Sequence, residues 1–334
     1  MIRALSGALR RRVIDSPHWR GLAYRALSSA PLNRSTIYRA LYRRRIVRQQ
    51  KDRRGFPRVV SVESTSACNA SCVMCGHRIM KRPVGRMSWG LYKNIVDQAR
   101  GWPLETFFLS GFGEPLLDPG LAAKAAYARE AGVANTAIVT NASLLTPDRA
   151  AELRDAGLGR IHLSLDAASP AAYSRLRPGL DFGRVMENID GLLRMRPRPA
   201  VVLQLVLVDQ GPAEVRAVIE RFRGRVERLT IRQAQDWAGR VALKTAAYSP
   251  HLSFRGHWPP CRYLWDQLNV CWDGTVPACC LDFEAEQPLG NARRQSLEEI
   301  WLGPVLGGLR KKHDAGRRGS IPLCRRCRYF PVWW

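Results

Sequence analysis

The chain is poor in acidic residues and contains no long apolar segment. Its 334 residues include 28 Asp and Glu against 53 Lys and Arg, which gives a formal net charge of +25. No apolar run approaches the roughly 18 residues that a membrane-spanning helix needs, and the longest mostly apolar run, 200–208, has the length of a strand. The N-terminal segment has no clean cleavage site and is not expected to be a secretory signal. We therefore expect a cytoplasmic protein.

The excess positive charge is concentrated in the N-terminal segment. Residues 1–57 contain 15 Lys and Arg but only 2 Asp, a net charge of +13. Such a segment can bind nucleic acid, an anionic membrane surface or an acidic partner, and it can also be a merely solvated arginine-rich stretch. Basic residues interleaved with aromatic stacking platforms are not obvious, which argues against nucleic acid. Trp19, Leu22 and Tyr24 among the arginines suit an interfacial helix, so peripheral docking on the inner membrane face is a hypothesis.

Beyond residue 57, short apolar runs alternate with amphipathic stretches. This alternation is typical of a parallel sheet covered by helices. Six strands are too few for a closed eight-stranded barrel, so we expect an α/β fold built as an open, partial (βα)6 barrel. Ligands of such sheets bind at the carboxyl ends of the strands. The expected strands are 58–65, 104–111, 135–142, 160–167, 200–208 and 226–235, and the helices between them are 89–100, 119–132, 146–157, 182–195 and 211–224.

The alternation stops near residue 240, which predicts four parts. Residues 1–57 form a basic helical extension, 58–240 the barrel core, 241–260 a proline-containing linker and 261–334 a small α+β module. A module of this size does not hold a generous core without a staple such as a metal site.

Two local patterns predict the elements of the small module. Asp273-Gly274 lies between two apolar runs and predicts a β-hairpin. Ser296, followed by Glu299, predicts the capped start of a helix over 296–312.

The chain has nine cysteines, yet no fourth cysteine accompanies the first three. Cys68, Cys72 and Cys75 lie within eight residues, directly after the first expected strand. An odd number of closely spaced cysteines without a secretory signal indicates metal ligation in a reducing compartment and not a disulfide framework. Structural zinc sites want four closed ligands, whereas three thiolates fit a 4Fe–4S cluster that keeps one iron open. Zinc with His77 as the fourth ligand is the alternative.

The C-x3-C-x2-C spacing after the first strand of a partial barrel resembles the radical S-adenosylmethionine (SAM) superfamily. The resemblance covers about residues 58–330, and it implies that the open iron chelates the amino and carboxylate groups of SAM. It also implies reductive cleavage of SAM to a 5′-deoxyadenosyl radical that abstracts a substrate hydrogen, with electrons from a donor such as flavodoxin or ferredoxin. Cys68, Cys72 and Cys75 would then be both metal ligands and catalytic residues.

Other residues at successive strand ends match the same family. The stretch "SGFGEPLL" is similar to its Gly-Gly-Glu-Pro motif, although Phe112 interrupts the glycine pair, and the match implies that Gly113 and Glu114 hold the SAM amino group. A carboxylate facing an ammonium is the expected charge-assisted pair. Taken singly, Glu114 could be a surface acid and Asp166 a helix cap. The remaining implied contacts with SAM are Asn141, Ser164, Asp166, Arg177 and Gln204.

A second set of cysteines in the C-terminal module resembles the SPASM/twitch module of some radical SAM enzymes. The stretch 288–310 is similar to the connecting segment of that module. Four ligands fully hold one auxiliary 4Fe–4S cluster, and this chain lacks the further cysteines of the two-cluster form. Zinc is the alternative, because zinc ribbons share this kind of spacing. The implied ligands are Cys261, Cys279, Cys324 and Cys327.

Two cysteines of the module have no place in that set. Cys280 is adjacent to Cys279, and although the spacing favours Cys279, a swap between them stays open. Cys271 is expected to be a buried thiol that acts as a small hydrophobic residue.

A fully ligated second cluster suggests that the reaction is a net oxidation. The spacing of the ligands and the single auxiliary cluster resemble the radical SAM aminocyclitol dehydrogenases, which implies an oxidoreductase that converts an alcohol of a small molecule or carbohydrate to a ketone. The alternatives are a ribosomal peptide maturase and, in another class, a non-catalytic iron–sulfur or RNA-binding protein. Candidates for the substrate pocket, which could equally be satisfied polar groups of the core, are Arg232, Gln233, Gln235, Asp236 and Trp237.

Overall fold

The computed structural model describes residues 55–243 and 260–327, together with positions 40, 41, 44 and 48. Most of the expected basic helical extension, including Trp19, Leu22 and Tyr24, therefore lies outside the described residues, as does most of the expected linker. Within the part of the chain that is described, no helix is both long and apolar enough to cross a bilayer.

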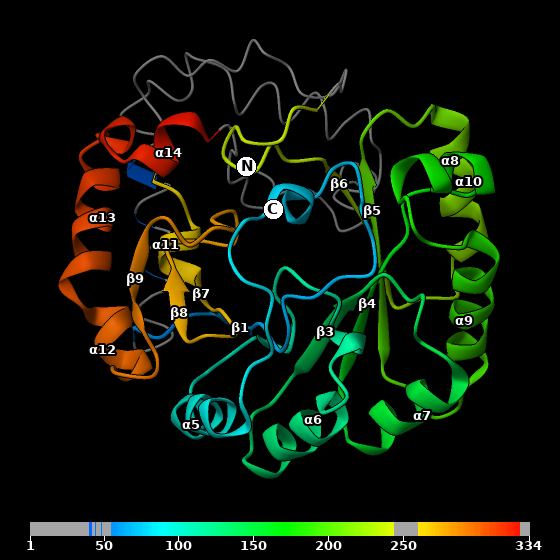
Figure 1. Ribbon diagram of the computed structural model, residues 1–334, viewed down its shortest axis with the longest axis horizontal. Helices are drawn as coiled ribbons and strands as arrows, with labels where there is room; N and C mark the ends of the chain where they lie inside the picture. The colour runs from blue at the N-terminus through cyan, green and yellow to red at the C-terminus, as the bar shows by residue number, and fades with distance from the viewer. Residues whose placement is uncertain (1–39, 42–43, 45–47, 49–54, 244–259, 328–334) are drawn as a thin grey trace.

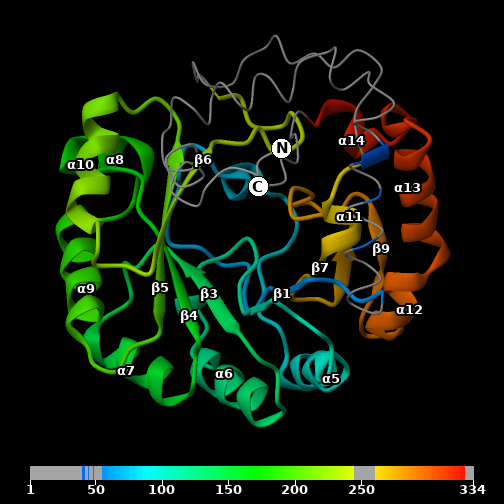
Figure 2. The ribbon, with the colours of Figure 1, turned by 180° about the vertical axis from the view of Figure 1, so that it is seen from behind.

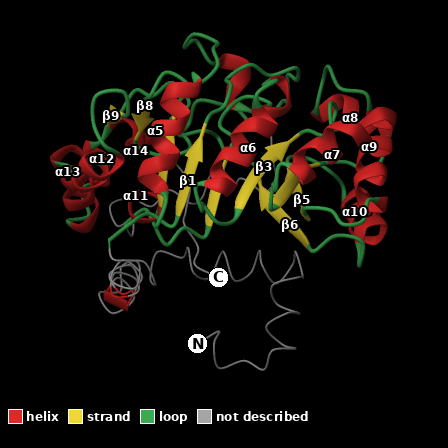
Figure 3. Cartoon of the chain, turned by 90° about the horizontal axis from the view of Figure 1, so that it is seen from below, coloured by secondary structure: helices red, strands yellow, loops and turns green. Residues whose placement is uncertain are grey.

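A parallel sheet with helices along its outer face forms the core of the fold (Figure 1). Its seven strands follow the order β6-β5-β4-β3-β2-β1-β7, and each neighbouring pair is parallel. The arrows of β1 and β3 point to the same edge in Figure 3, where the loops that follow the strands gather. The strands are β1 (Val59–Val62), β2 (Thr106–Phe108), β3 (Thr136–Thr140), β4 (Arg160–Ser164), β5 (Ala200–Leu207), β6 (Arg228–Gln233) and β7 (Gln267–Val270).

The seventh strand comes from the C-terminal module and corrects the expected hairpin. β7 pairs in parallel with β1, from Val59↔Gln267 to Val62↔Val270. The Asp273-Gly274 turn is present, and Gly274 adopts a φ of +90° that favours glycine. However, β8 (Thr275–Pro277) leaves the main sheet and pairs antiparallel with β9 (Pro288–Asn291). The module and the core are thus joined through a shared sheet.

Three of the core helices, α5, α7 and α9, begin at side-chain caps that satisfy free backbone N–H groups. The Ser88, Thr146 and Asp181 side chains each accept a hydrogen bond from a backbone N–H in the first helical turn. All five expected helices are confirmed, and one further helix, α8, precedes α9. The elements are η2 (Gly76–Ile79), α5 (Trp89–Ala99), η3 (Pro115–Leu117), α6 (Leu121–Glu130), α7 (Pro147–Asp155), α8 (Pro170–Leu176), α9 (Phe182–Arg194) and α10 (Pro212–Phe222).

The C-terminal module packs the β8–β9 pair against short helices. The capping box of Ser296 and Glu299 is confirmed. The expected single helix over 296–312 is two helices, because Gly303 is extended and a proline at 304 cannot continue the preceding helix. Figures 1 and 2 show α12 and α13 at one end of the sheet and α8 to α10 at the other. The helices are α11 (Tyr263–Asp266), α12 (Leu297–Leu302), α13 (Pro304–Asp314), η4 (Arg318–Ser320) and α14 (Pro322–Arg326).

One continuous apolar core supports both parts. Buried Val60, Phe107 and Leu203 of the main sheet belong to the same cluster as Trp301 and Leu306 of the module. Burial of this much apolar surface is the main favourable contribution to folding. The strand ends of both parts therefore rest on one shared apolar core.

Candidate active site and second cysteine site

The loop after β1 brings Cys68, Cys72 and Cys75 together. It is anchored to the end of α8 by two backbone bonds, in which Ser71 N donates to Pro178 O and Val73 N donates to Leu176 O, each at 3.0 Å. Burial raises the pKa of both Cys68 and Cys75 to about 11, and repulsion from neighbouring thiols adds to this effect. The three thiols are thus close enough to interact, as the sequence predicted.

A buried cation lies against the second of these cysteines. Arg177 Nη1 is 3.5 Å from Cys72 Sγ, while Nε and Nη2 of the same guanidinium bind Asp166 Oδ2 at 2.8 and 2.6 Å. The other carboxylate oxygen, Oδ1, accepts from Val206 N at 2.7 Å. Burial raises the pKa of Cys72, and the positive charge of Arg177 opposes that effect. Arg177 and Asp166, both predicted to contact SAM, therefore form one unit that faces Cys72.

Glu114 binds the loops of two strands to each other. Its buried carboxylate accepts from Thr140 Oγ1 at 2.7 Å, from Asn141 N at 2.8 Å and from Leu116 N at 3.1 Å. Burial raises its pKa, and these donors oppose the rise. A carboxylate has about four lone-pair positions, so three donors from the chain leave little capacity for an external ammonium group.

Gly113 allows the motif loop to approach the cysteine loop. A Cβ at this position would lie 2.4 Å from Thr65 O and 2.5 Å from Ala67 O. The next residue, Glu114, donates its backbone N–H to Ala67 O at 2.8 Å. Only glycine permits this approach, which places the motif directly against the residue before Cys68.

A network of amide side chains connects the end of β3 with the cysteine loop. Asn141 Nδ2 donates to Asn69 Oδ1, and Asn69 Nδ2 donates to Ser143 Oγ, both at 2.9 Å. Ser143 Oγ in turn donates to Asn141 Oδ1 at 2.7 Å. The sequence indicated Asn141 but missed Asn69, whose only local signal is its position between the first two cysteines.

Ser164 and Gln204 lie side by side on adjacent strands. The register of β4 and β5 pairs them directly. Gln204 Nε2 donates to His162 Nδ1 at 2.8 Å, so this amide, predicted as a SAM contact, is engaged by another strand residue.

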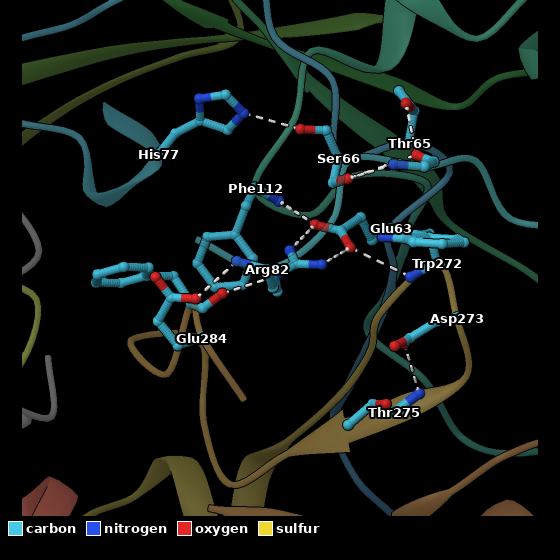
Figure 4. Close-up of polar contacts among 12 residues, drawn as sticks. Glu63, Thr65, Ser66, His77, Arg82, Phe112, Trp272, Asp273, Thr275 and Glu284 are labelled. Carbon is cyan, nitrogen blue, oxygen red and sulfur yellow. Dashed lines mark hydrogen bonds and ion pairs between the residues drawn. The ribbon is translucent and has the colours of Figure 1, made fainter. Parts of the chain in front are cut away.

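His77 is turned toward the backbone. Its Nε2 donates to Ser66 O at 2.8 Å, as Figure 4 shows. A zinc site would need a ring nitrogen free to coordinate, and only Nδ1 is left for that role. The contact gives His77 a structural role beside the cysteine loop.

A buried ion pair fastens the segment after Cys75 to the C-terminal module (Figure 4). Arg82 Nη1 donates to Glu63 Oε2 at 2.8 Å, and Arg82 Nε donates to Phe283 O at 2.7 Å. Glu63 also accepts from Phe112 N at 3.1 Å and from Trp272 N at 3.2 Å. No local sequence pattern predicts this pair, which joins four loops around one carboxylate.

The second set of cysteines lines a cavity in the module. Cys261, Cys279, Cys324 and Cys327 all line it, together with apolar residues of the module and Ala238 of the core. Burial raises the pKa of Cys261 to about 11 and that of Cys324 to about 12. The structure therefore gathers the four thiols that the sequence grouped.

Cys280 and Cys271, the remaining cysteines of the module, have surroundings that differ from those of the four cavity cysteines. Cys280 is absent from the described lining of the cavity, and its thiol lies beside the Tyr263 side chain. Burial raises the pKa of Cys280 to about 12, and the contact with Tyr263 partly offsets this rise. Cys271 is buried after β7, near Glu63, and belongs to neither set.

The chemistry of the donors suits an iron–sulfur group, because all four are cysteine thiols. Four thiols placed around a cavity fit an iron–sulfur cluster, which binds its cysteines through separate irons.

Two polar side chains also face this cavity. Cys261 N donates to His313 Nδ1 at 3.1 Å, so the proton of the neutral ring resides on Nε2. That Nε2 is buried and has no hydrogen-bond partner among the described groups, although the ring lines the cavity. Arg318 Nη2 donates to Cys327 O at 3.0 Å. Neither residue was recognised from the sequence.

The segment after β6 lies between the two cysteine sites. Trp237 Nε1 donates to Met74 O, within the first cysteine loop, at 2.7 Å, and the next residue, Ala238, lines the second cavity. Both residues have positive φ, 49° and 60°, a conformation that costs non-glycine residues energy. Trp237 also packs against Phe112 and Phe283. Of the pocket candidates, Trp237 thus contacts the cysteine loop.

The other pocket candidates differ in exposure. Asp236 is buried, Gln235 is half-buried, and Arg232 and Gln233 are exposed.

Comparison with known proteins identifies two segments. The family model described as the radical SAM superfamily matches residues 62–222, and the SPASM model, described as an iron–sulfur cluster-binding domain, matches residues 261–328. An AdoMet-dependent heme synthase of Methanosarcina barkeri is 34% identical over 41% of this chain and 39% of its own length. A GTP 3′,8-cyclase of Synechococcus sp. is 37% identical over 35% of this chain and 34% of its own. The matches thus span well under half of these curated relatives.

Solved structures share the fold of the chain. BtrN in complex with AdoMet and 2-DOIA has a TM-score of 0.56 and 20% identity, covering 81% of this chain and 93% of that one. SuiB of Streptococcus suis, bound to the precursor peptide SuiA, has a TM-score of 0.65 and 15% identity, covering 91% and 80%. At these identities the likeness is one of fold.

Proposed function

This chain belongs to the radical SAM superfamily and carries a C-terminal SPASM domain, and from that premise we propose that it oxidises an alcohol of a small molecule or carbohydrate. The observation that carries the proposal is the cavity lined by four thiols, which the Trp237–Ala238 segment connects to the three-thiol loop. With clusters bound, such an arrangement would give one site that is open to a ligand and one that is fully ligated by protein.

The cofactors of the family are a 4Fe–4S cluster with SAM and a further iron–sulfur group. Cys68, Cys72 and Cys75 would hold the first, and the four cavity thiols would hold the second. When bound, the first cluster and SAM supply a radical that removes a hydrogen atom from the substrate, and the second cluster supplies an acceptor for one electron.

Charged residues of the chain position the loops and thiols of the first site. Arg177 offers a guanidinium to Cys72, so it favours the thiolate form that binds metal. Asp166 holds Arg177 in place through two bonds. Glu114 and Gly113 fix the neighbouring loop against the cysteine loop. We infer that these residues orient SAM through the loops they position, with backbone groups of the motif as its contacts.

Net oxidation requires that the substrate lose a hydrogen atom, a proton and an electron. The second site is apolar apart from its thiols, His313, Arg318 and Tyr263. Four cysteine ligands would leave a cubane cluster no open position for substrate, which supports a role in electron uptake.

Peptide maturation is the second candidate. It is favoured by the likeness to SuiB, whose structure holds a precursor peptide. The likeness is one of fold, so it supplies no peptide-binding residues for this chain. Heme synthase and GTP cyclase activities belong to relatives that this chain matches over less than half their length.

The test is an anaerobic reconstitution with iron and sulfide. About eight irons per chain, four for each cuboidal cluster, followed by formation of 5′-deoxyadenosine from SAM and dithionite, are expected. Deuterium transfer from labelled alcohols to 5′-deoxyadenosine would then identify the substrate. Zinc in place of iron, or no cleavage of SAM by the fully loaded protein, would overturn the proposal. Crosslinked or epimerised peptide as the product would favour the second candidate.

A further inference from the structure

The last strand of the barrel carries cationic side chains on its inner face. Leu229 and Ile231 of β6 pack against the apolar core. Side chains alternate between the two faces of a strand, so Arg228, Thr230 and Arg232 lie on the opposite face. Both arginines are exposed, whereas the two aliphatic residues are partly covered.

The strand register extends this face across the barrel. Arg228 and Thr230 of β6 pair with Val202 and Gln204 of β5. Val202 and Gln204 in turn pair with His162 and Ser164 of β4. Arg160 of β4 lies on the same face as His162. The inner face of three adjacent strands thus carries three guanidinium groups, an amide, hydroxyls and an imidazole.

His162 is held neutral on this face. Burial, with the nearby charges of Arg160, Arg232 and Arg228, lowers the pKa of His162 to about 4. Its Nδ1 accepts from Gln204 Nε2 at 2.8 Å, so its proton is on Nε2. That Nε2 is buried and lacks a hydrogen-bond partner among the described residues. A buried donor without a partner is costly, so Nε2 is able to donate to a bound acceptor.

The face offers hydrogen-bond donors and positive charge. In the described part of the chain, no ion pair engages Arg228 or Arg232, whereas Arg177, Arg198 and Arg225 all have carboxylate partners. Planar guanidinium groups bind carboxylate and phosphate oxygens in pairs.

We propose that Arg228, Arg232 and His162 bind an oxyanion of the substrate, a phosphoryl or a carboxylate group, on the inner face of β4 to β6. This inference rests on the proposed function and deepens it, because it makes the substrate an anionic small molecule and not a neutral sugar. The face belongs to the same barrel whose strand ends carry the three-thiol loop. An anion bound there would be fixed by β6 while its remaining part extends toward that loop.

Two anions distinguish the possible sources of the oxyanion. Calorimetric titration of the reconstituted protein, without SAM or reductant, would use pyrophosphate as the phosphoryl probe and succinate as the carboxylate probe. Loss of a charge-assisted contact in Arg228→Gln or Arg232→Gln should weaken binding of the preferred probe by roughly tenfold or more. Arg216→Gln on the outer helix α10 removes the same charge from an exposed position and should change the affinity by less than about twofold.

A second readout localises the anion. NMR of the histidine rings, assigned with His162→Asn, should show that the saturating anion raises the pKa of His162 from about 4, since an anion offsets the repulsion by the arginines. Equal weakening by all three arginine variants, no binding of either probe, or an unchanged His162 pKa would each overturn the proposal. Failure of the wild-type protein to cleave SAM would count against the proposed function alone, because anion binding is measured without SAM.

Discussion

The two cysteine sites differ in what surrounds their thiols. The first loop is surrounded by charged and amide groups, with Arg177 against Cys72 and the Asn69–Asn141 network at its side. Apart from its four thiols, the second cavity is lined by aliphatic residues, with Tyr263, His313 and Arg318 as polar exceptions. A polar, three-thiol site suits a group that must also bind a charged cofactor, while an apolar, four-thiol site suits a closed one.

The same difference appears in how each site is built. The first uses three thiols from one short loop, whose position depends on neighbouring strand loops. The second uses thiols that are far apart in the sequence, from Cys261 to Cys327, so it forms only when the module folds. A metal group at the second site therefore contributes directly to folding of the module.

The largest expected effect is the loss of SAM cleavage when a cysteine of the first site is replaced. Cys72→Ala should abolish 5′-deoxyadenosine formation and lower the iron content from about eight to about four per chain, because only the first cluster is lost. Iron analysis measures the iron content, and chromatography measures the 5′-deoxyadenosine that is formed. Cys271→Ala, a buried cysteine outside both sets, is the matched control and should retain both properties. Activity in Cys72→Ala would contradict the assignment of the first site.

The next prediction concerns the adjacent cysteines of the module. Cys279→Ser should lose the second cluster and lower the melting temperature, because Cys279 lines the cavity and the cluster staples the module. Cys280→Ser makes the same chemical change one residue away and should keep about eight irons. Iron content and thermal unfolding under anaerobic conditions are the measurements. The opposite pattern would show that Cys280 is the ligand.

The contrast also explains what could be predicted from sequence. Cys68, Cys72 and Cys75 are local in the chain, so their spacing alone revealed the site. The choice between Cys279 and Cys280 was open, because adjacent residues differ only in which one faces the cavity. His313 contacts Cys261 across 52 positions and carries no motif, so it could be found only from the fold.

The strands of the fold were predictable from the sequence, but not all of their pairings. Alternating apolar runs gave six strands of the parallel sheet, because period and length are local properties. Which strands pair depends on residues that are far apart in the sequence. The expected hairpin therefore placed β7 beside β8, whereas the structure pairs β7 with β1. The Glu63–Arg82 pair escaped notice for the same reason, since a carboxylate after a strand does not reveal which loop will cover it.

A smaller effect is expected at the charged pair of the first site. Arg177→Met leaves the buried Asp166 without its cation and should cost about 3–5 kcal/mol of stability. The double variant Arg177→Met/Asp166→Asn should recover part of this loss, because no buried charge remains. Thermal unfolding of the four proteins of the cycle measures the coupling. Additive effects of the two substitutions would contradict a direct interaction.

The smallest effect should appear in the second site. If His313 Nε2 donates to the cluster or its thiolates, the bond stabilises the more negative reduced state, and His313→Phe should lower the midpoint potential. A bond of about 1 kcal/mol corresponds to about 40 mV for one electron. Redox titration followed by electron paramagnetic resonance measures the shift, and the first cluster of the same molecule serves as an internal control. His313→Gln keeps an N–H donor and should restore part of the potential, whereas equal potentials in all three proteins would show that the ring only fills space.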